Sequence, residues 1–156
     1  MRPALLWTFG VLAALRIVSP LTVTVVQGHS MEPTMHSGGL YVLDRSYYRS
    51  HELARGDVVV LRHAGITYVK RVCAVPGDRL WLLHFDDGIG DEVVTASEAA
   101  KLRTIKAREH LHDQEILHLT IPPGHCFVVG DNQPVSLDSR AFGPVPISEI
   151  VGRAML

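Results

Sequence analysis

Four short segments of the chain concentrate the residues that could carry out chemistry. They are Gly28–Thr34, Gly56–Val60, Tyr68–Asp78 and Gly130–Gly143. The first contains Ser30, and a serine hydroxyl is a poor nucleophile until a base takes its proton. Taken singly, each segment also has an ordinary structural explanation. Ser30 precedes a proline and could close a turn, Lys70 could lie on the solvent side of an edge strand, and the polar residues of the last segment could form a turn and a surface ion pair.

In this order and with these internal spacings, the four segments resemble the conserved boxes of the type I signal peptidase family. Those boxes read Ser-Met-x-Pro-Thr, Gly-Asp-hydrophobic, Lys-Arg-Val-x-Gly-x-Pro-Gly-Asp, and Gly-Asp-Asn-Arg-x-x-Ser-x-Asp-Ser-Arg. The resemblance extends from Gly28 to Gly143, and one apolar segment lies just ahead of it, as in that family. Four boxes in the same order make a specific signal.

The resemblance implies a serine protease in which Ser30 is the nucleophile and Lys70 is the general base. For a lysine to accept a proton near neutral pH, its pKa must fall from about 10.4 toward roughly 7–8, which burial against apolar side chains can achieve. Tyr68 and Val69 before Lys70, and Val72 after it, provide a β setting with apolar neighbours. No cofactor is implied, because nucleophile and base are both side chains.

The resemblance also implies supporting and substrate-binding residues. Ser136 falls on the family's serine that hydrogen-bonds and orients the lysine amine. The positions that brace the site through polar contacts are Arg71, Asp131, Asp138 and Arg140. The positions expected to contact substrate are Met31, Pro33, Tyr68 and Val69.

Three positions depart from the family's pattern. Ala74 stands in place of a glycine, and Gln133 stands in place of a frequent arginine. Gly28 lies where some relatives carry a serine or threonine whose hydroxyl completes the oxyanion hole, so the remaining donor that the resemblance implies is the backbone N–H of Ser30. On a strand, residues 28 and 30 share a face, and Gly28→Ser is expected to raise turnover unless the glycine has a strained backbone.

The histidines could suggest a histidine base or a metal site, but their positions in the sequence favour neither. His29 adjoins Ser30, but adjacent residues on a strand point to opposite faces, so His29 is not expected to be the base. His110, His112 and His118 lie in a polar stretch that is typical of a solvated surface, and we expect no metal site there.

The elements that would position these residues are mostly short strands. Apolar runs bounded by glycine, proline and aspartate predict strands at 40–43, 57–61, 66–69, 80–83 and 126–129. Thr95–Glu98 resembles a capping box, which predicts a short surface helix over 96–109. The chain is therefore expected to be mostly β, and the resemblance implies two antiparallel sheets.

Residues 1–26 are expected to form one N-terminal transmembrane helix. Leu5–Val26 is apolar except for Arg16 and a few small polar residues, and about 20 such residues span a bilayer. A cleaved secretion signal is the alternative, but apolar character resumes after Arg16. Pro20 favours an end or bend of the helix near residues 18–19. Arg2 precedes the segment, which favours a cytoplasmic N-terminus at the inner membrane and an extracytoplasmic catalytic domain over 27–156.

Composition limits the partners. The chain has 15 basic and 16 acidic residues, without the basic excess of a nucleic-acid binder. Cys73 and Cys126 each lie in an apolar run, which favours two buried thiols, although one disulfide remains open. Together with the resemblance, these observations predict a membrane-bound endopeptidase that removes signal peptides from secreted precursors with small residues before the cut. Its partners would be the precursor, membrane lipid and the secretion translocon.

Two alternatives remain from the sequence. A specialised relative could mature one pilin-like or conjugation substrate with the same dyad, and a decayed homologue could serve as a membrane-tethered binding module. A soluble repressor-type autoprotease fits poorly, because the only Ala-Gly pair, Ala64-Gly65, lies downstream of Ser30.

Overall fold

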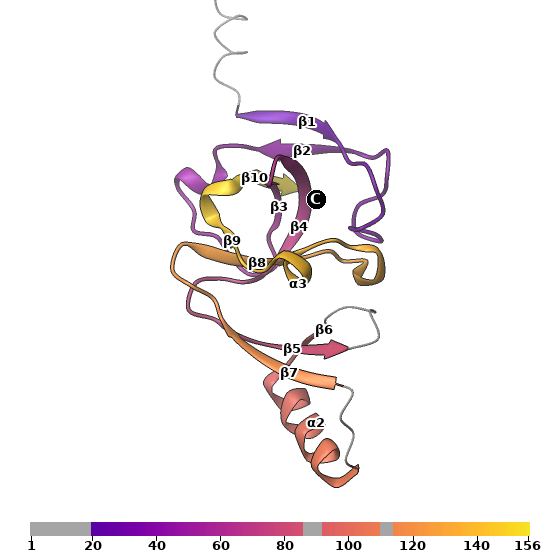
Figure 1. Ribbon diagram of the computed structural model, residues 1–156. Helices are drawn as coiled ribbons and strands as arrows, with labels where there is room; N and C mark the ends of the chain where they lie inside the picture. Colours follow the sequence, from indigo (N-terminus) through magenta and orange to yellow (C-terminus); the bar gives the residue numbers. More distant parts are fainter. Residues whose placement is uncertain (1–19, 86–91, 110–113) are drawn as a thin grey trace, which may run out of the picture.

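The computed structural model describes residues 20–85, 92–109 and 114–156 (Figure 1). Most of this part belongs to a seven-stranded antiparallel sheet. In spatial order its strands are β1 (Leu21–Val25), β2 (Leu40–Asp44), β10 (Ile150–Met155), β3 (Val58–His63), β4 (Ile66–Ala74), β8 (His125–Val129) and β9 (Val145–Pro146). The expected mostly β architecture is therefore confirmed.

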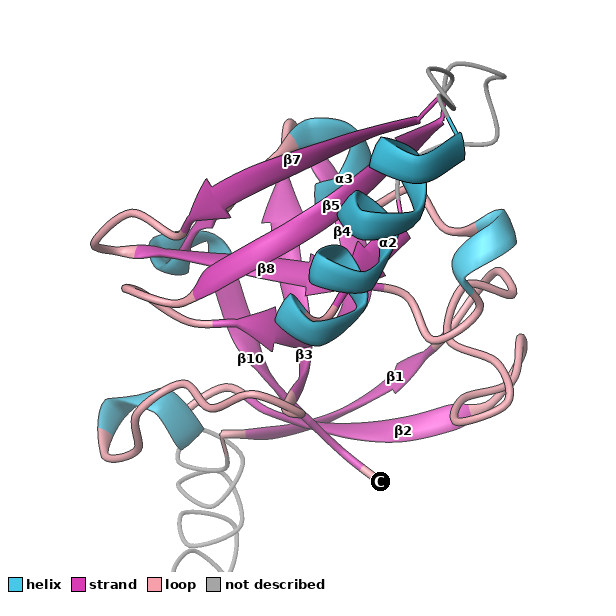
Figure 2. Ribbon diagram, turned by 90° about the horizontal axis from the view of Figure 1, so that it is seen from below, coloured by secondary structure: helices cyan, strands magenta, loops and turns pink. Residues whose placement is uncertain are grey.

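A second antiparallel sheet has three strands, in the order β6 (Glu92–Val94), β5 (Arg79–Phe85) and β7 (Gln114–Thr120). Helix α2 (Ala96–Glu109) packs on β5 (Figure 2). Its N-terminus has the expected capping box, since the Glu98 carboxylate accepts from Thr95 N at 2.8 Å and Thr95 Oγ1 accepts from Glu98 N at 3.3 Å. The predicted helix over 96–109 is confirmed.

The short helical turns lie in the connections between strands. They are η1 (Tyr47–Arg49), η2 (Gln133–Val135), α3 (Ser139–Phe142) and η3 (Ile147–Glu149). Figure 1 shows β1 and β2 at one end of the domain, and the small sheet with α2 at the other end. The two sheets join through the turn between β4 and β5, where Gly77 has φ +85°.

The expected boundary of the membrane anchor is wrong. Residues 21–25 belong to the predicted transmembrane helix, but they form strand β1 and pair with β2 from Leu21↔Asp44 to Val25↔Leu40. Alternating leucine, valine and threonine suits a strand as well as a membrane helix, and pairing with β2 satisfies the backbone here. In the ranges that the structure describes, no helix is both long and apolar enough to span a bilayer. The rest of the predicted anchor, residues 1–19, lies outside those ranges.

Strands β6, β7, β9 and β10 were not predicted. The polar character of residues 110–118 favours a solvated surface, yet residues 114–120 form β7, which pairs with β5 over its whole length. The pairing partner, β5, lies about 35 positions earlier in the chain, so inspection of the local residues could not reveal it.

The loop between β1 and β2 carries Ser30, and a hydrogen bond between its two ends closes it. Val26 N donates to Gly39 O at 3.1 Å, which closes the loop where the two strands begin to diverge. Met31 and Met35 are 1% and 0% exposed and pack into a core cluster with Val26. The two methionines therefore fix the loop against the sheet, with Ser30 at its inner side.

Candidate active site

Ser30 and Lys70 are in direct contact. Lys70 Nζ donates to Ser30 Oγ at 2.8 Å. Ser30 lies in the loop after β1, whereas Lys70 lies in the middle of β4, opposite Val59 of β3. The contact therefore depends on the packing of the loop against the central strands, and it unites the two residues that the sequence singled out.

Lys70 is buried although it carries an amine. Its exposed fraction is 3%, on the inward side of β4 with Val72 and Ala74. Burial lowers the pKa of Lys70; the Asp138 carboxylate opposes this shift, and the Arg140 guanidinium adds to it. Nζ also lies 5.7 Å from the centroid of the Tyr68 ring. A buried lysine with a lowered pKa can exchange a proton with a hydroxyl at hydrogen-bond distance.

A second loop holds the backbone of the Ser30 segment. Asn132 N donates to Ser30 O at 3.0 Å, and Asn132 Nδ2 donates to His29 O at 3.1 Å. Asn132 was not among the predicted site residues, although it is part of the last box that suggested the family. Its backbone and side chain together join the loop after β8 to the loop after β1.

Arg71 and Asp131 form a two-point ion pair beside the dyad. Arg71 Nε donates to Asp131 Oδ1 at 2.8 Å, and Arg71 Nη2 donates to Oδ2 at 2.6 Å. Arg71 Nη1 also donates to Gly56 O at 2.8 Å, and Nη2 lies 3.4 Å from Thr34 Oγ1. The pKa of Asp131 is lowered: burial alone would raise it, and hydrogen bonds from Arg71 and Thr34 outweigh burial. The pair thus ties β4 to both loops of the site.

Asp138 is the centre of a second polar network. It is 0% exposed and accepts from Gly130 N at 2.9 Å, from Arg140 Nε at 2.9 Å and from Arg140 Nη2 at 3.0 Å. The pKa of Asp138 is lowered, since burial would raise it but hydrogen bonds from Arg140 and Gly130 N prevail. Arg140 Nη1 donates to Gln133 Oε1 at 3.2 Å. Gln133, which stands where an arginine is frequent, is therefore a neutral partner for Arg140.

Ser139 supports the same network from the start of α3. Its hydroxyl is buried and accepts from Val128 N at 3.0 Å. Val128 lies beside the irregularity in the pairing of β4 with β8, between Val72 and Ala74. The sequence placed Ser139 inside the last box without assigning it a role, and its contact fixes β8 next to Lys70's strand. Ala74, another departure from the family, is 1% exposed and packs in the core.

Ser136 does not make the hydrogen bond that we expected. Its Oγ is buried and has no hydrogen-bond partner within the described part of the chain, so the predicted bond to the Lys70 amine is absent from this structure. The hydroxyl lies near enough to the Asp138 carboxylate to help lower its pKa without meeting hydrogen-bond geometry. It faces the Cα of Gly130, because a Cβ there would overlap Ser136 Oγ. Rotation of one side-chain bond would redirect it.

Gly28 does not lie on a strand, which corrects the premise for Gly28→Ser. Residues 28–35 form turns, and Gly28 has φ +94°, a left-handed conformation that L side chains rarely adopt. Its N–H donates to Ser37 Oγ at 3.1 Å. Within the described ranges, the N–H of Ser30 donates no hydrogen bond. The second donor of an oxyanion hole is therefore not supplied by position 28.

The four expected substrate-binding residues differ in accessibility. Met31 is 1% exposed and belongs to the core, so it offers almost no surface to a peptide. Pro33 is exposed, and Tyr68 and Val69 are half-buried on β4 next to Lys70. The contact of these four residues with substrate stays a prediction, and the burial of Met31 makes it the weakest of the four.

The histidines take other contacts. The His29 ring is paired with Glu32, Nδ1 to Oε1 at 2.9 Å, rather than with Ser30. His118 lies on β7 with its ring against that of Trp81, at a centroid distance of 5.3 Å. His110 and His112 lie outside the described ranges.

The two cysteines are free thiols on different sides of the main sheet. Cys126 packs with Val72 and Val128, and burial raises its pKa to about 11. Cys73 packs against the cluster of Ala74 and Phe127. Burial also raises the pKa of the Cys73 thiol, so neither cysteine resembles an activated nucleophile.

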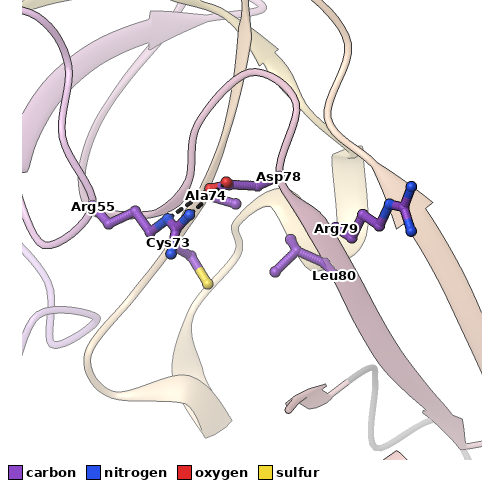
Figure 3. A pocket seen from close by; sticks show the side chains of 6 residues that line it. All are labelled: Arg55, Cys73, Ala74, Asp78, Arg79 and Leu80. Carbon is purple, nitrogen blue, oxygen red and sulfur yellow. Dashed lines mark hydrogen bonds and ion pairs between the residues drawn. The ribbon is translucent and has the colours of Figure 1, made fainter. Parts of the chain in front are cut away.

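Cys73 lines a pocket at the junction of β4 and β5, separate from the dyad (Figure 3). The residues around it are Arg55, Cys73, Ala74, Asp78, Arg79 and Leu80. Arg55 Nη2 and Asp78 Oδ1 form an ion pair at 2.6 Å across it, and Asp78 Oδ2 accepts from Val75 N at 2.9 Å. These contacts give the Pro-Gly-Asp part of the third box a structural role, because they stabilise the turn that connects the two sheets.

Comparison with known proteins gives consistent matches. A family model described as "Signal peptidase, peptidase S26" matches residues 3–156. Signal peptidase I of Bacillus caldolyticus is 38% identical over 136 residues, covering 83% of this chain and 74% of that protein. Signal peptidase IB of Staphylococcus aureus is 31% identical over 157 residues, covering 88% and 75%. A solved signal peptidase I from Enterococcus faecalis V583 is 26% identical over 66% of this chain and 97% of its own, with a TM-score of 0.41.

Proposed function

The chain belongs to the signal peptidase, peptidase S26, family, and from this premise we propose that it removes signal peptides from exported precursors with Ser30 as nucleophile and Lys70 as general base. The observation that carries the proposal is the 2.8 Å contact between Lys70 Nζ and Ser30 Oγ. Burial and the lowered pKa of Lys70 support it, because an ordinary surface lysine would stay protonated near neutral pH.

The reaction begins when neutral Lys70 accepts the proton of Ser30 Oγ. The oxygen attacks the carbonyl carbon of the scissile peptide bond, and the carbonyl oxygen takes the negative charge. The Lys70 ammonium then gives its proton to the departing amine, which leaves an ester on Ser30. A water molecule, deprotonated by Lys70, attacks that ester, and the proton returns to Ser30 Oγ as the signal peptide leaves with a new carboxylate.

The backbone N–H of Ser30 is the proposed donor to the oxyanion. It makes no other hydrogen bond in the described ranges, so it is available to the developing charge. Asn132, through Ser30 O, holds this peptide unit from its other side. The resemblance implies that Ser136 orients the Lys70 amine, which would require its hydroxyl to rotate; Ser136 Oγ has no other hydrogen-bond partner among the described residues to hold it in place.

The substrate would approach over β4. Tyr68 and Val69 flank Lys70 and retain partial exposure, and Pro33 is exposed beyond Ser30. We propose precursors with small residues before the cut as substrates, with the catalytic domain outside the inner membrane and residues before β1 as its anchor. Membrane lipid and the translocon would be the partners. A dedicated pilin-type or conjugation substrate uses the same dyad, and a panel of precursors separates the two roles.

The test is cleavage of labelled precursor peptides by the full-length chain in detergent. Ser30→Ala and Lys70→Ala are each expected to abolish cleavage, and Lys70→Arg as well, because a guanidinium cannot act as a base near neutral pH. The matched controls are Ser50→Ala and Lys101→Ala, which change exposed residues of the same types. The dyad is refuted if Lys70→Ala keeps more than a few per cent of the activity while remaining folded.

The pH profile provides a second, independent test. Since burial lowers the pKa of Lys70, cleavage should rise with pH with an apparent pKa well below 10.4. A rate that is flat between pH 6 and 10, with the protein folded throughout, would exclude a lysine base.

A further inference from the structure

Three ring side chains, Tyr68, Phe142 and His63, form a row that ends at the dyad. The ring centroids of Tyr68 and Phe142 are 5.8 Å apart, and those of Phe142 and His63 are 4.7 Å apart. Ring pairs at ~4.5–7 Å with tilted planes attract each other beyond the burial of their area. Lys70 Nζ lies 5.7 Å from the Tyr68 centroid. We call the three rings the aromatic row.

The register of the β3–β4 hairpin places two of these rings on the face that carries Lys70. On β4, Tyr68 and Lys70 are two positions apart and therefore point to the same face. On β3, His63 pairs with Ile66, which is two positions before Tyr68, so His63 shares that face. Phe142 ends helix α3 and is brought to this face from a distant part of the chain.

Phe142 is fixed at both its backbone and its ring. Its N–H donates to Asp138 O at 3.2 Å, within the turn that the Asp138 side chain caps. Its ring contacts His63, which is itself fixed, because His63 Nδ1 lies 2.7 Å from Glu149 Oε2. The side chains of His63 and Glu149 are only 26% and 29% exposed. Phe142 is therefore a rigid neighbour for the Tyr68 ring.

Tyr68 needs such a neighbour to stay beside the amine. Its side chain is half-buried, whereas Lys70 is 3% exposed. A tyrosine on a strand has more than one allowed rotamer. Contact with Phe142 favours the rotamer that keeps the Tyr68 ring next to Nζ. Without Phe142, the ring would be free to turn aside and water would reach the amine.

Burial matters more for Lys70 than the charges around it. It is the largest cause of the lowered pKa of Lys70, while Asp138 and Arg140 act in opposite directions. The hydroxyl of Ser30 accepts from Nζ, and that of Tyr68 is the titratable group next to it on β4. The remaining titratable groups of this face, His63 and Glu149, lie beyond Phe142 in the aromatic row. Admission of water would therefore return the pKa of Lys70 toward its ordinary value.

We propose that Phe142 is a positioning residue for the reaction, which holds the Tyr68 ring against Lys70 and keeps water from the amine. The inference rests on the proposed role of Lys70 as base. Phe142 acts through Tyr68, and its contribution is the pH range in which the enzyme works.

The experiment measures kcat/KM of the full-length chain in detergent between pH 6 and 10. Phe142→Ala and Phe142→Leu should move the midpoint of the profile up by ~1 pH unit, which lowers the rate at pH 7 about tenfold and leaves the plateau near that of the parent. Phe142→Tyr keeps the ring and should keep the parental profile. The matched control is Leu53→Ala, because Leu53 packs against the same core cluster from the loop before β3. It should lose stability without a change in the midpoint.

An unchanged midpoint in a folded Phe142→Leu protein would overturn the inference, whatever its KM. Phe142 would then serve packing or substrate contacts alone. An equal shift in Leu53→Ala would also overturn it, since general loosening of the core would then account for the effect. If Phe142→Ala does not fold, Phe142→Leu decides.

A second measurement does not depend on cleavage. In the Ser30→Ala background, acetic anhydride labels neutral lysine amines, and mass spectrometry compares Lys70 with the exposed Lys101 at each pH. Adding Phe142→Leu should raise the pH at which Lys70 becomes reactive, and an unchanged titration of Lys70 would refute the positioning role. Failure of the parent to cleave any precursor would refute the proposed function, whereas the labelling would still report on Phe142.

Discussion

Gly130 is in close contact with both loops of the site, so replacing it with alanine should displace Ser30. Gly130 lies just after β8, and its N–H is held by Asp138 Oδ2 at 2.9 Å. A Cβ at this position would overlap Ser136 Oγ, and it would lie 2.5 Å from Ser30 O and 2.6 Å from Ser136 Cβ. Two of these neighbours are backbone or the first atom of a side chain, so neither can turn away.

The magnitude follows from the displacement that Gly130→Ala requires. Ordinary contact with a Cβ begins at 3.4 Å, so the Ser30 carbonyl would have to retreat by about 0.9 Å. Ser30 Oγ belongs to the same residue and would move relative to Lys70 Nζ. A misplacement of ~1 Å can cost ~10²-fold in rate. We expect kcat/KM to fall ~10²-fold, mainly through kcat, with a loss of stability in the ~1–3 kcal/mol range of an overpacked site.

The assay combines cleavage kinetics with urea unfolding of the same preparations. Gly152→Ala is the matched control, because its Cβ would clash with Asp44 O on β2 and with the Cα of Arg45 at 2.9 Å, and with no site residue. It should lose comparable stability but keep most of its activity at a temperature where it is folded. The comparison of the two variants therefore separates a loss of activity from a loss of stability.

Wild-type kcat/KM in a folded Gly130→Ala protein would refute the reasoning. It would mean that the loop after β8 does not set the position of Ser30. An equal loss of activity in the two glycine variants would also refute it, since general destabilisation would then account for the effect.

Three further changes test other parts of the site. Lys70→Met should be inactive yet more stable than the parent near pH 7, because burial lowers the pKa of Lys70 in the folded state. The gain in stability from methionine should be largest below that pKa and disappear as pH rises toward ~10.4. Urea unfolding of both proteins across this pH range measures it. Asp138→Asn should lose ~3–5 kcal/mol in unfolding measurements, because it removes the carboxylate charge from the buried pair with Arg140; a loss below ~1 kcal/mol would contradict this. Gly28→Ser should lower the melting temperature without raising turnover, since φ is +94°, and any gain in turnover would count against the strained backbone.

The residues of the dyad could be found from the sequence because the four boxes keep their internal spacing. Ser30, Lys70, Asp131 and Asp138 all lie together in the structure, within the two loops and strand β4. The helix over 96–109 was predictable for a local reason, since the capping box joins residues only three positions apart.

The direction of side chains was not predictable in the same way. Met31 and Ser30 are neighbours, yet one is buried in the core and the other faces Lys70. A strand over residues 28–30 would give Gly28 and Ser30 a common face, whereas these residues lie in bends and turns. A box records which residues occur, whereas the φ and ψ angles of a turn decide where each of them points.

Only the tertiary structure decides which distant segments of the chain pair as strands. Residues 21–25 are leucine, threonine and valine, a composition that lipid would accept in a helix and that a sheet accepts in a strand. Only the pairing with β2, and of β2 with β10 at the other end of the chain, selects the strand. The sequence by itself indicated the family and the candidate pair, Ser30 and Lys70. The fold determined the burial of Lys70 and, within the described ranges, the lack of a hydrogen-bond partner for Ser136 Oγ, because each depends on contacts between segments that lie far apart in the chain.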